Sequence, residues 1–214
     1  MDSDKIINKV KKYINKLYSE YTERGGGYNY RYVHAVRVCN MAMRYVEENN
    51  IEIDSKALAL SCLLHDVGKV SFTDGVEINM DLDDIHHCKE GAKKAKEILI
   101  GLGVEDMVLI EHVSDVILNH HSTNHELKIV EILQNSDDLD ELGYLNVWRM
   151  FNFSSQKKRP PFDTCSYWVK QYPLVKEKVD SNFSIPFFKD LALKRLERCN
   201  DFINKFEEEL ESRD

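Results

Sequence analysis

The sequence predicts an all-α fold, a single-domain helical bundle over residues 1–214. The first observation is composition, since only four prolines and nine glycines interrupt a chain of 214 residues that is rich in helix-forming residue types. The second is periodicity, because apolar residues recur at helical spacing along most of the chain and no segment alternates convincingly as a strand would. The hydrophobic share of 43% and the charged share of 31% are ordinary for a soluble globular protein.

Helices are expected along most of the chain. The expected ranges are 4–24, 30–49, 55–66, 85–99, 104–121, 127–142 and 187–211. The first helix places Ile6 and Ile14 on one stripe, and the glycines of "RGGGYN" end it. The third, "SKALALSCLLHD", is apolar nearly all round and is expected to be the central buried helix, capped by Asp54 or Ser55. The core is expected to span about 28–153, with the first and last helices packed on it.

Three features are expected to interrupt the helices. Gly68 follows the third helix and is expected to stop it. The stretch 71–84, "SFTDGVEINMDLDD", is polar and rich in turn residues, which predicts a loop over a site. The stretch 153–164, "FSSQKKRPPFDT", is expected to be a proline-containing linker loop.

Charge and cysteine usage limit the function classes. The net charge of -8 argues against an extended basic face for nucleic acid, although a small anionic ligand in a locally basic pocket stays compatible with it. The N-terminal segment has no signal-peptide pattern and no segment has eighteen apolar residues in a row, so we expect no membrane partner. The five scattered cysteines indicate reduced, mostly buried thiols of a cytoplasmic protein. These patterns leave the oligomeric state open.

Histidines and carboxylates gather at helix ends and in apolar helical segments. The residues concerned are His34, His65, Asp66, His86, His87, His120, His121, Asp137 and Asp138. A metal site in a helical bundle needs imidazole and carboxylate side chains that converge from several helices. A divalent cation would also remove the cost of burying His65 beside Asp66, because it pairs with the carboxylate and accepts the imidazole lone pair.

Each of these residues also has a structural explanation when it is taken alone. His34 on an amphipathic helix is more often a core or boundary histidine, and His65 with Asp66 could be a helix-dipole partner and a capping acid. The two His-His pairs would more often be solvated helix ends, and His112 and His125 are expected to be structural or surface residues. All these explanations must hold independently in one small chain, which favours the metal site.

The order of His34, His65–Asp66 and Asp137 resembles the HD superfamily of metal-dependent phosphohydrolases. "NYRYVHAVRV" is similar to the family's first histidine helix, and "LLHDVGK" is similar to its commonest second motif. The likeness covers roughly residues 28–205 and implies the family's helical fold.

Further motifs extend the resemblance. "HHCKEGA" resembles the H-x-x-x-G-A element of family versions with extra metal ligands, which selects His87. "VILNHHS" resembles an I-x-x-H-S or I-x-x-H-H element, which selects His120 with His121 as its neighbour. "LQNSDDLDELGYLNVWRMF" resembles the A-D-R-L-D-x-x-G segment of small bacterial and archaeal HD hydrolases, which selects Asp137 rather than Asp138 as the final ligand.

The chain also departs from the family pattern. Asp138 stands where the subgroup usually has an arginine, and the segment between Lys69 and His86 is an insertion. No Gly-Tyr-Pro motif follows the second His-His pair, so a cyclic-dinucleotide phosphodiesterase of that branch is not expected.

The resemblance implies metal-dependent hydrolysis of a small phosphorylated compound, most often a nucleotide. The cofactor would be one or two divalent transition metal ions, Mn, Fe, Co, Ni or Zn. The implied primary ligands are His34, His65, Asp66 and Asp137, and the possible ligands of a second ion are His87, His120 and His121. The metal would activate the water that attacks phosphorus.

Three cations are candidate phosphate contacts. Lys69 lies one turn past His65, Arg37 lies one turn past His34, and Arg149 lies in "NVWRMF". Lys69 could instead be a solvated lysine at a helix C-terminus, and Arg149 could be a surface or ion-paired residue.

Two other function classes stay open at the level of sequence. Some HD-fold proteins with the full His/Asp set hold two irons and perform oxygen-dependent cleavage. A set of six ligands, in which His87 and His120 (or His121) join the four primary ones, keeps a di-iron oxygenase possible. A non-catalytic nucleotide-binding regulator is the third class, although an intact ligand set argues against it.

Overall fold

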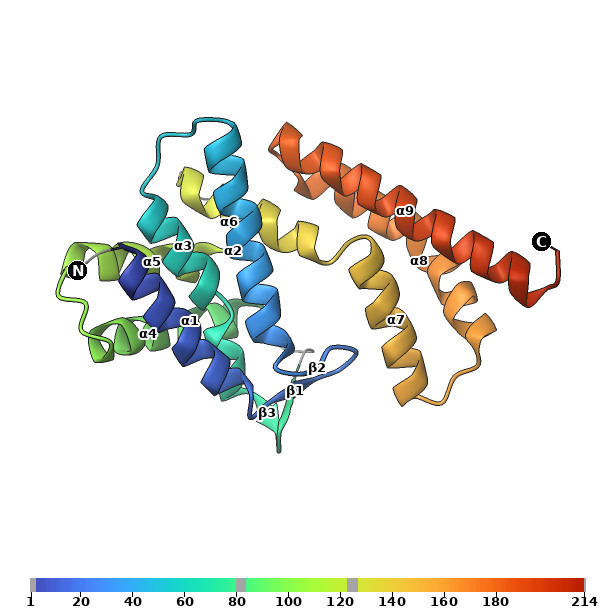
Figure 1. Ribbon diagram of the computed structural model, residues 1–214, viewed down its shortest axis with the longest axis horizontal. Helices are drawn as coiled ribbons and strands as arrows, with labels where there is room; N and C mark the ends of the chain where they lie inside the picture. Colours follow the sequence, from blue (N-terminus) through green and yellow to red (C-terminus); the bar gives the residue numbers. More distant parts are fainter. Residues whose placement is uncertain (1–2, 80–83, 123–126, 214) are drawn as a thin grey trace. The chain divides into compact units, whose positions relative to one another are not determined.

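The computed structural model describes residues 3–79, 84–122 and 127–213, and most of them are helical (Figure 1). The helices of the N-terminal part are α1 (Ser3–Tyr18), α2 (Tyr30–Glu48), α3 (Ser55–Leu64), the short 3-10 helix η1 (Val67–Ser71), α4 (Asp84–Gly101), α5 (Met107–Asn119) and α6 (Lys128–Asp140). They are followed by α7 (Tyr144–Gln156), α8 (Pro161–Asn182) and α9 (Pro186–Leu210). The predicted all-α class is confirmed for the residues described.

The chain divides by its internal contacts into two compact units, residues 1–136 and 137–214. In the first unit, α1 packs against α2 and α3, α3 packs against α5, and α4 packs against both α5 and η1. In the second unit, α7, α8 and α9 pack against one another. Helix α6 begins in the first unit and continues into the second. The expectation of one domain, with both terminal helices on a common core, stays a prediction.

The core of the first unit forms where apolar periodicity is clearest. Helix α1 buries Ile6, Val10, Ile14 and Tyr18, which recur every four residues and therefore line one face. Helix α3 is buried all round from residue 57 to residue 64, as its continuous apolar sequence predicts. Asp54 is its N-cap, because its carboxylate accepts hydrogen bonds from the backbone N–H groups of Lys56 and Ala57.

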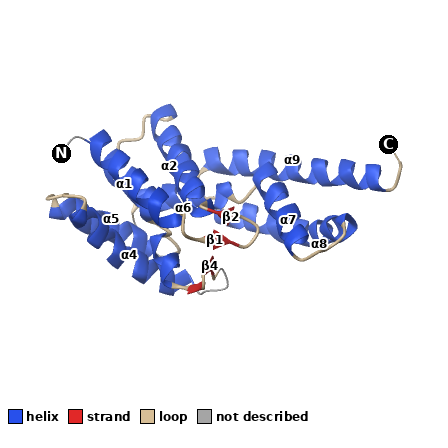
Figure 2. Ribbon diagram, turned by 60° about the horizontal axis from the view of Figure 1, so that its bottom comes forward, coloured by secondary structure: helices blue, strands red, loops and turns tan. Residues whose placement is uncertain are grey.

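A small sheet is the main departure from the predicted architecture. Its strands are β1 (Thr22–Glu23), β2 (Gly27–Tyr28), β3 (Thr73–Asp74) and β4 (Glu77–Ile78), in the order β2-β1-β4-β3 (Figure 2). Strand β1 runs antiparallel to β2 and parallel to β4, while β3 and β4 form a hairpin. The expectation of no strand was wrong, because strands of two residues are too short to show the alternation that marks a strand.

The sheet accounts for two wrong boundaries. The first helix ends at Tyr18 rather than at residue 24, because the chain continues into β1. The predicted loop 71–84 contains the β3–β4 hairpin, whose Gly75 has a φ of 61° that suits glycine. Residues 80–83 of that stretch lie outside the described residues.

The predicted linker at 153–164 is mostly helical. Helix α7 continues to Gln156, and α8 begins at Pro161, where proline is tolerated because a first-turn N–H has no helical partner. Only residues 157–160 separate the two helices. Pro173 lies inside α8, a position that the sequence rules disfavour. Among the described helices, none is both long and apolar enough to cross a membrane.

Candidate metal centre

The first cluster joins helix α2 to the end of α3. His34 lies on α2, His65 is the C-cap of α3, and Asp66 follows it. All three are buried, with exposed fractions of 2%, 0% and 1%. The Nε2 atoms of His34 and His65 are 3.2 Å apart, and Asp66 Oδ2 lies 3.6 Å from the first and 3.5 Å from the second. Three potential metal ligands therefore point at one place.

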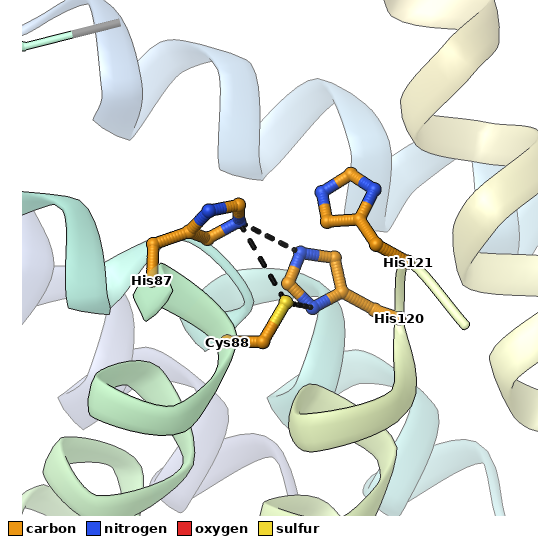
Figure 3. A group of neighbouring side chains, drawn as sticks. All are labelled: His87, Cys88, His120 and His121. Carbon is orange, nitrogen blue, oxygen red and sulfur yellow. Dashed lines mark hydrogen bonds between the residues drawn. The ribbon is translucent and has the colours of Figure 1, made fainter. Parts of the chain in front are cut away.

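The second cluster joins helix α4 to the end of α5. His87 lies on α4 and His120 is the C-cap of α5, and both are buried. Their Nε2 atoms are 3.4 Å apart (Figure 3). The ring of His121 lies beside both, with centroids 5.1 Å from His87 and 4.2 Å from His120, although His121 is exposed. Each predicted histidine pair therefore has one buried member. His87 is buried beside the exposed His86, and His120 is buried beside the exposed His121.

The same backbone contact orients one histidine of each cluster. His65 Nδ1 lies 2.8 Å from the carbonyl oxygen of Cys62, and His120 Nδ1 lies 2.6 Å from the carbonyl oxygen of Ile117. A carbonyl can only accept a hydrogen bond, so each Nδ1 carries a proton, and Nε2 is the ring nitrogen that faces the neighbouring histidine. This orientation makes Nε2 the nitrogen that would bind a metal.

The carboxylate of Asp66 connects the clusters. Its Oδ2 faces His34 and His65, while its Oδ1 lies 3.8 Å from His87 Nε2 and 2.9 Å from Lys69 Nζ. The buried Oδ1 makes no hydrogen bond of good geometry in the described residues, so the Lys69 contact is an ion pair. One carboxylate thus presents a different oxygen to each histidine pair.

The electrostatics favour the ligand forms of these side chains. Burial alone would raise the pKa of Asp66, but Lys69 and other neighbouring groups lower it by more than burial raises it. The pKa of Asp66 therefore lies well below its usual range. Burial, reinforced by His121, holds the pKa of His120 well below its usual value. Asp66 is therefore ionised and His120 is neutral at neutral pH.

The distances fit divalent transition metals. Two nitrogens that bind one ion at about 2.1 Å each lie about 3.0 to 3.4 Å apart for the usual coordination angles. The Nε2 separations of 3.2 Å and 3.4 Å fall in this range, one in each cluster. Mixed imidazole and carboxylate ligands suit Mn, Fe, Co, Ni or Zn. The residues of the first unit could therefore hold one ion per histidine pair.

Two predicted site residues belong to the second unit. Asp137 lies on α6. Its neighbour Asp138 is engaged elsewhere, because its carboxylate lies 3.2 Å from Lys178 Nζ. Arg149 lies on α7, 3.5 Å from a carboxylate oxygen of Glu141. The roles of Asp137 and Arg149 in the metal centre stay predictions.

The other predicted residues lie in the first unit. Lys69 is on η1, beside Asp66. Arg37 lies on α2 with its guanidinium 5.4 Å from the ring centroid of Tyr30 and hydrogen-bonded to the Tyr30 hydroxyl at 3.3 Å. His112 is half-buried on α5, and His125 lies outside the described residues.

Three residues of the site were not predicted from sequence. Cys88 is buried, with its Sγ 3.5 Å from His120 Nδ1 and 3.9 Å from His87 Nε2 (Figure 3). Arg31 donates to Asp66 Oδ2 and to both carboxylate oxygens of Glu23. Arg31 lies one helical turn before His34, so helical periodicity could have placed it on the same face. Nothing in the sequence marks Glu23.

Several solved structures have a fold similar to that of this chain. An HD-superfamily hydrolase from Bacillus thuringiensis is 21% identical, with a TM-score of 0.69 over 98% of this chain and 99% of that chain. YpgQ from Bacillus subtilis, in complex with ADP, is 17% identical, with a TM-score of 0.63 over 97% and 100% of the two chains. Lin1889 from Listeria innocua is also 17% identical, with a TM-score of 0.64 over 99% and 98%. At these identities the likeness shows the fold.

The family assignment comes from the sequence. No curated protein matches the chain. The model of the HD domain family matches residues 31–142, which is more than half of the chain and includes His34, the His65–Asp66 pair and Asp137. The chain therefore belongs to the HD domain family.

Proposed function

We propose that this protein is a metal-dependent phosphohydrolase that hydrolyses a phosphate ester or anhydride of a nucleotide. Family membership and the buried ligand clusters support metal-dependent hydrolysis in general. One observation carries the proposal: the two oxygens of Asp66 face two different pairs of buried histidines. A carboxylate in this position can bridge two ions, as in sites that hydrolyse phosphate bonds.

The proposed ligand sets follow from the two clusters. The primary ion would be held by His34, His65 and Asp66 Oδ2, together with Asp137 as the family motif implies. The second ion would be held by His87, His120 and Asp66 Oδ1, with His121 beside them. When bound, the metal would supply Lewis-acid stabilisation of the phosphate and a water acidic enough to attack near neutral pH.

The chain itself would contribute charge and orientation. Lys69 is 17% exposed, so its ammonium could contact a phosphate oxygen without leaving Asp66, 2.9 Å away. Arg37, held over the ring of Tyr30, and Arg149 are proposed as further phosphate contacts. The ionised Asp66 and the neutral imidazole of His120 need no proton loss before they bind metal.

A nucleotide is the proposed substrate class for two reasons. Asp66 lies beside the cationic Lys69, which provides an anion-attracting group at the candidate centre. The structurally similar YpgQ was crystallised with ADP, which makes nucleoside diphosphates the first compounds to test.

The test combines metal analysis with a phosphate-release screen over nucleoside mono-, di- and triphosphates. We expect the purified protein to bind transition metal and to release phosphate or pyrophosphate from at least one nucleotide. His65→Ala and Asp137→Ala should each abolish release while the protein stays folded. His112→Ala is the matched control, since His112 is half-buried on α5 and outside both clusters. Absence of metal binding, or of any hydrolysis after Mn, Fe, Co, Ni and Zn have each been supplied, would show that the proposal is wrong.

The same preparation separates the rival functions. A di-iron oxygenase would consume O₂ in proportion to product, whereas the hydrolase should work equally well without O₂. A regulator would bind a nucleotide without turning it over.

Metal stoichiometry tests the two-ion arrangement. We expect two ions per chain in the wild-type protein and one in His120→Ala, because that substitution removes a ligand of the second ion only. Elemental analysis after equilibrium dialysis measures both. A single ion in the wild-type protein would show that only the primary site forms.

A further inference from the structure

A buried ion network extends from Asp66 to a residue outside the proposed ligand set. The Arg31 guanidinium donates from Nη1 to Asp66 Oδ2. Its Nε and Nη2 donate to the two carboxylate oxygens of Glu23, and the bond from Nη2 to Glu23 Oε1 is 2.8 Å long. The exposed fractions of Arg31 and Glu23 are 3% and 2%. Arg31 therefore lies between two buried carboxylates, and only one of them is a proposed metal ligand.

The geometry of Arg31 restricts its movement. A guanidinium is planar, and a bidentate contact with a carboxylate fixes both its position and its plane. Glu23 occupies one edge of the Arg31 fork in this way, so the Nη1 donor is directed at Asp66 Oδ2. A carboxylate can otherwise rotate about its Cβ–Cγ bond, and this rotation would exchange the oxygens that face the two histidine pairs.

The small sheet holds Glu23 in place. Glu23 is the second residue of β1, which is paired with β2 on one side and with β4 on the other. The N–H of Thr22 donates to the carbonyl of Val76 at 2.9 Å, and Glu23 is in register with the buried Ile78. The β3–β4 hairpin belongs to the segment between Lys69 and His86. The hairpin thus supports the strand whose carboxylate holds Arg31.

We propose that Glu23 and Arg31 form a positioning clamp on Asp66, anchored by the small sheet, which keeps one oxygen of Asp66 directed at each proposed metal. The clamp rests on the proposed function, because it acts on the proposed bridging ligand. Neither residue is proposed to touch metal or substrate. Partners that orient a metal ligand typically change metal affinity by 10- to 100-fold when they are removed, roughly the size of effect expected here.

The test is Mn²⁺ binding to the full chain, measured by calorimetric titration of metal-free protein. We expect Glu23→Gln and Arg31→Gln each to weaken binding about tenfold or more. Arg31→Lys should not restore affinity, because lysine keeps the charge but lacks the fork that joins both carboxylates. Arg44→Gln is the matched control, since Arg44 pairs with Glu48 at 2.7 Å on the exposed face of the same helix α2. This control should keep the wild-type affinity.

A double variant distinguishes the clamp from general destabilisation. Arg31→Gln leaves the buried Glu23 carboxylate without the guanidinium, and Glu23→Gln leaves Arg31 with Asp66 alone, so each lowers stability. Glu23→Gln/Arg31→Gln instead removes both charges of this buried pair together. Since Glu23 acts only through Arg31, we expect the double variant to bind Mn²⁺ as weakly as Arg31→Gln does, even where its thermal stability is closer to wild type. Affinity losses that simply add, or full affinity in the double variant or in Arg31→Lys, would overturn the clamp.

The outcomes for the clamp and for the function are separable. If the wild-type chain binds no transition metal, the proposed function fails. If the wild-type chain binds metal and the clamp variants bind it equally well, the function stands and only the clamp is wrong.

Discussion

His65 and His120 make the same contact with the backbone at the end of a helix. Each follows the last residue of a helix, and each directs Nδ1 at the carbonyl three residues earlier. The last carbonyls of a helix lack the N–H donor of a following turn, so this contact gives one of them a further donor and also fixes the orientation of the imidazole ring. The position of these histidines at helix ends was predictable from sequence, but the contact that orients them was not.

Cys88 provides a prediction at the scale of a single residue. Its sulfur lies at the Nδ1 edge of His120, whereas the Nε2 atom faces His87 (Figure 3). We therefore expect Cys88→Ser to keep the wild-type number of metal ions and to change metal affinity by less than about tenfold. Elemental analysis and Mn²⁺ titration measure these quantities. Loss of one ion per chain would instead make the Cys88 thiolate a ligand of the second metal.

At the scale of elements, two helices approach closely enough to need glycine. A Cβ on Gly68 would lie 2.1 Å from the carbonyl oxygen of His87 and 2.5 Å from the N atom of Gly91. The sequence suggested that Gly68 stops α3, but it lies inside η1, and its role is to let η1 contact α4. This contact brings the segment after Asp66 against the helix that carries His87.

Gly68→Ala tests this contact. The added methyl group meets backbone atoms, which cannot rotate away, so η1 and α4 must separate. We expect a loss of about 3 kcal/mol in the free energy of unfolding, at the upper end for overpacked cores, and weaker metal binding. Urea denaturation gives the first quantity.

Gly101→Ala is the matched control for that substitution. Gly101 ends the same helix α4, and a Cβ there would meet nothing within 4 Å. We expect a neutral or slightly stabilising effect, because alanine favours the helix by up to about 1 kcal/mol. Equal losses in both variants would contradict the close-contact explanation.

Local sequence rules failed where elements are very short or where packing overrides propensity. The two-residue strands form because the segment after α1 and the segment after η1 meet in space, and neither has a strand pattern of its own. The prolines at 160 and 161 suggested a linker, yet α8 begins at Pro161 and also contains Pro173. In α8, the buried Trp168 packs its ring edge to Tyr172 and donates to Asn200 Oδ1 on α9. The bond to Asn200 joins α8 to α9, and tertiary packing of this kind offsets the cost of a proline in a helix.

At the scale of the whole molecule, metal binding should stabilise the fold. The proposed ligands within the first unit come from α2, α4 and the ends of α3 and α5, so a bound ion joins helices that the unfolded chain does not bring together. A ligand at 100 times its Kd adds about 2.7 kcal/mol to the free energy of unfolding. We expect Mn²⁺ to raise Tm, and EDTA to reverse the increase.

Two controls accompany this measurement. The His65→Ala variant should gain much less from Mn²⁺, because it lacks a primary ligand. Mg²⁺ should have little effect on the wild-type protein, because imidazole ligands favour transition metals. An identical Tm with and without Mn²⁺ would contradict a metal centre built from these helices.

The sequence by itself determined the helical class, because periodicity and composition are local properties that a linear chain displays. It also indicated His34, His65, Asp66, His87 and His120, since their order and spacing match a family motif. Only the tertiary structure decided that the two oxygens of Asp66 face different histidine pairs. It also decided that Arg31 bonds this carboxylate while Glu23 bonds Arg31. These relations join residues from β1, α2, α3 and α4, and sequence spacing does not specify how side chains from separate elements meet.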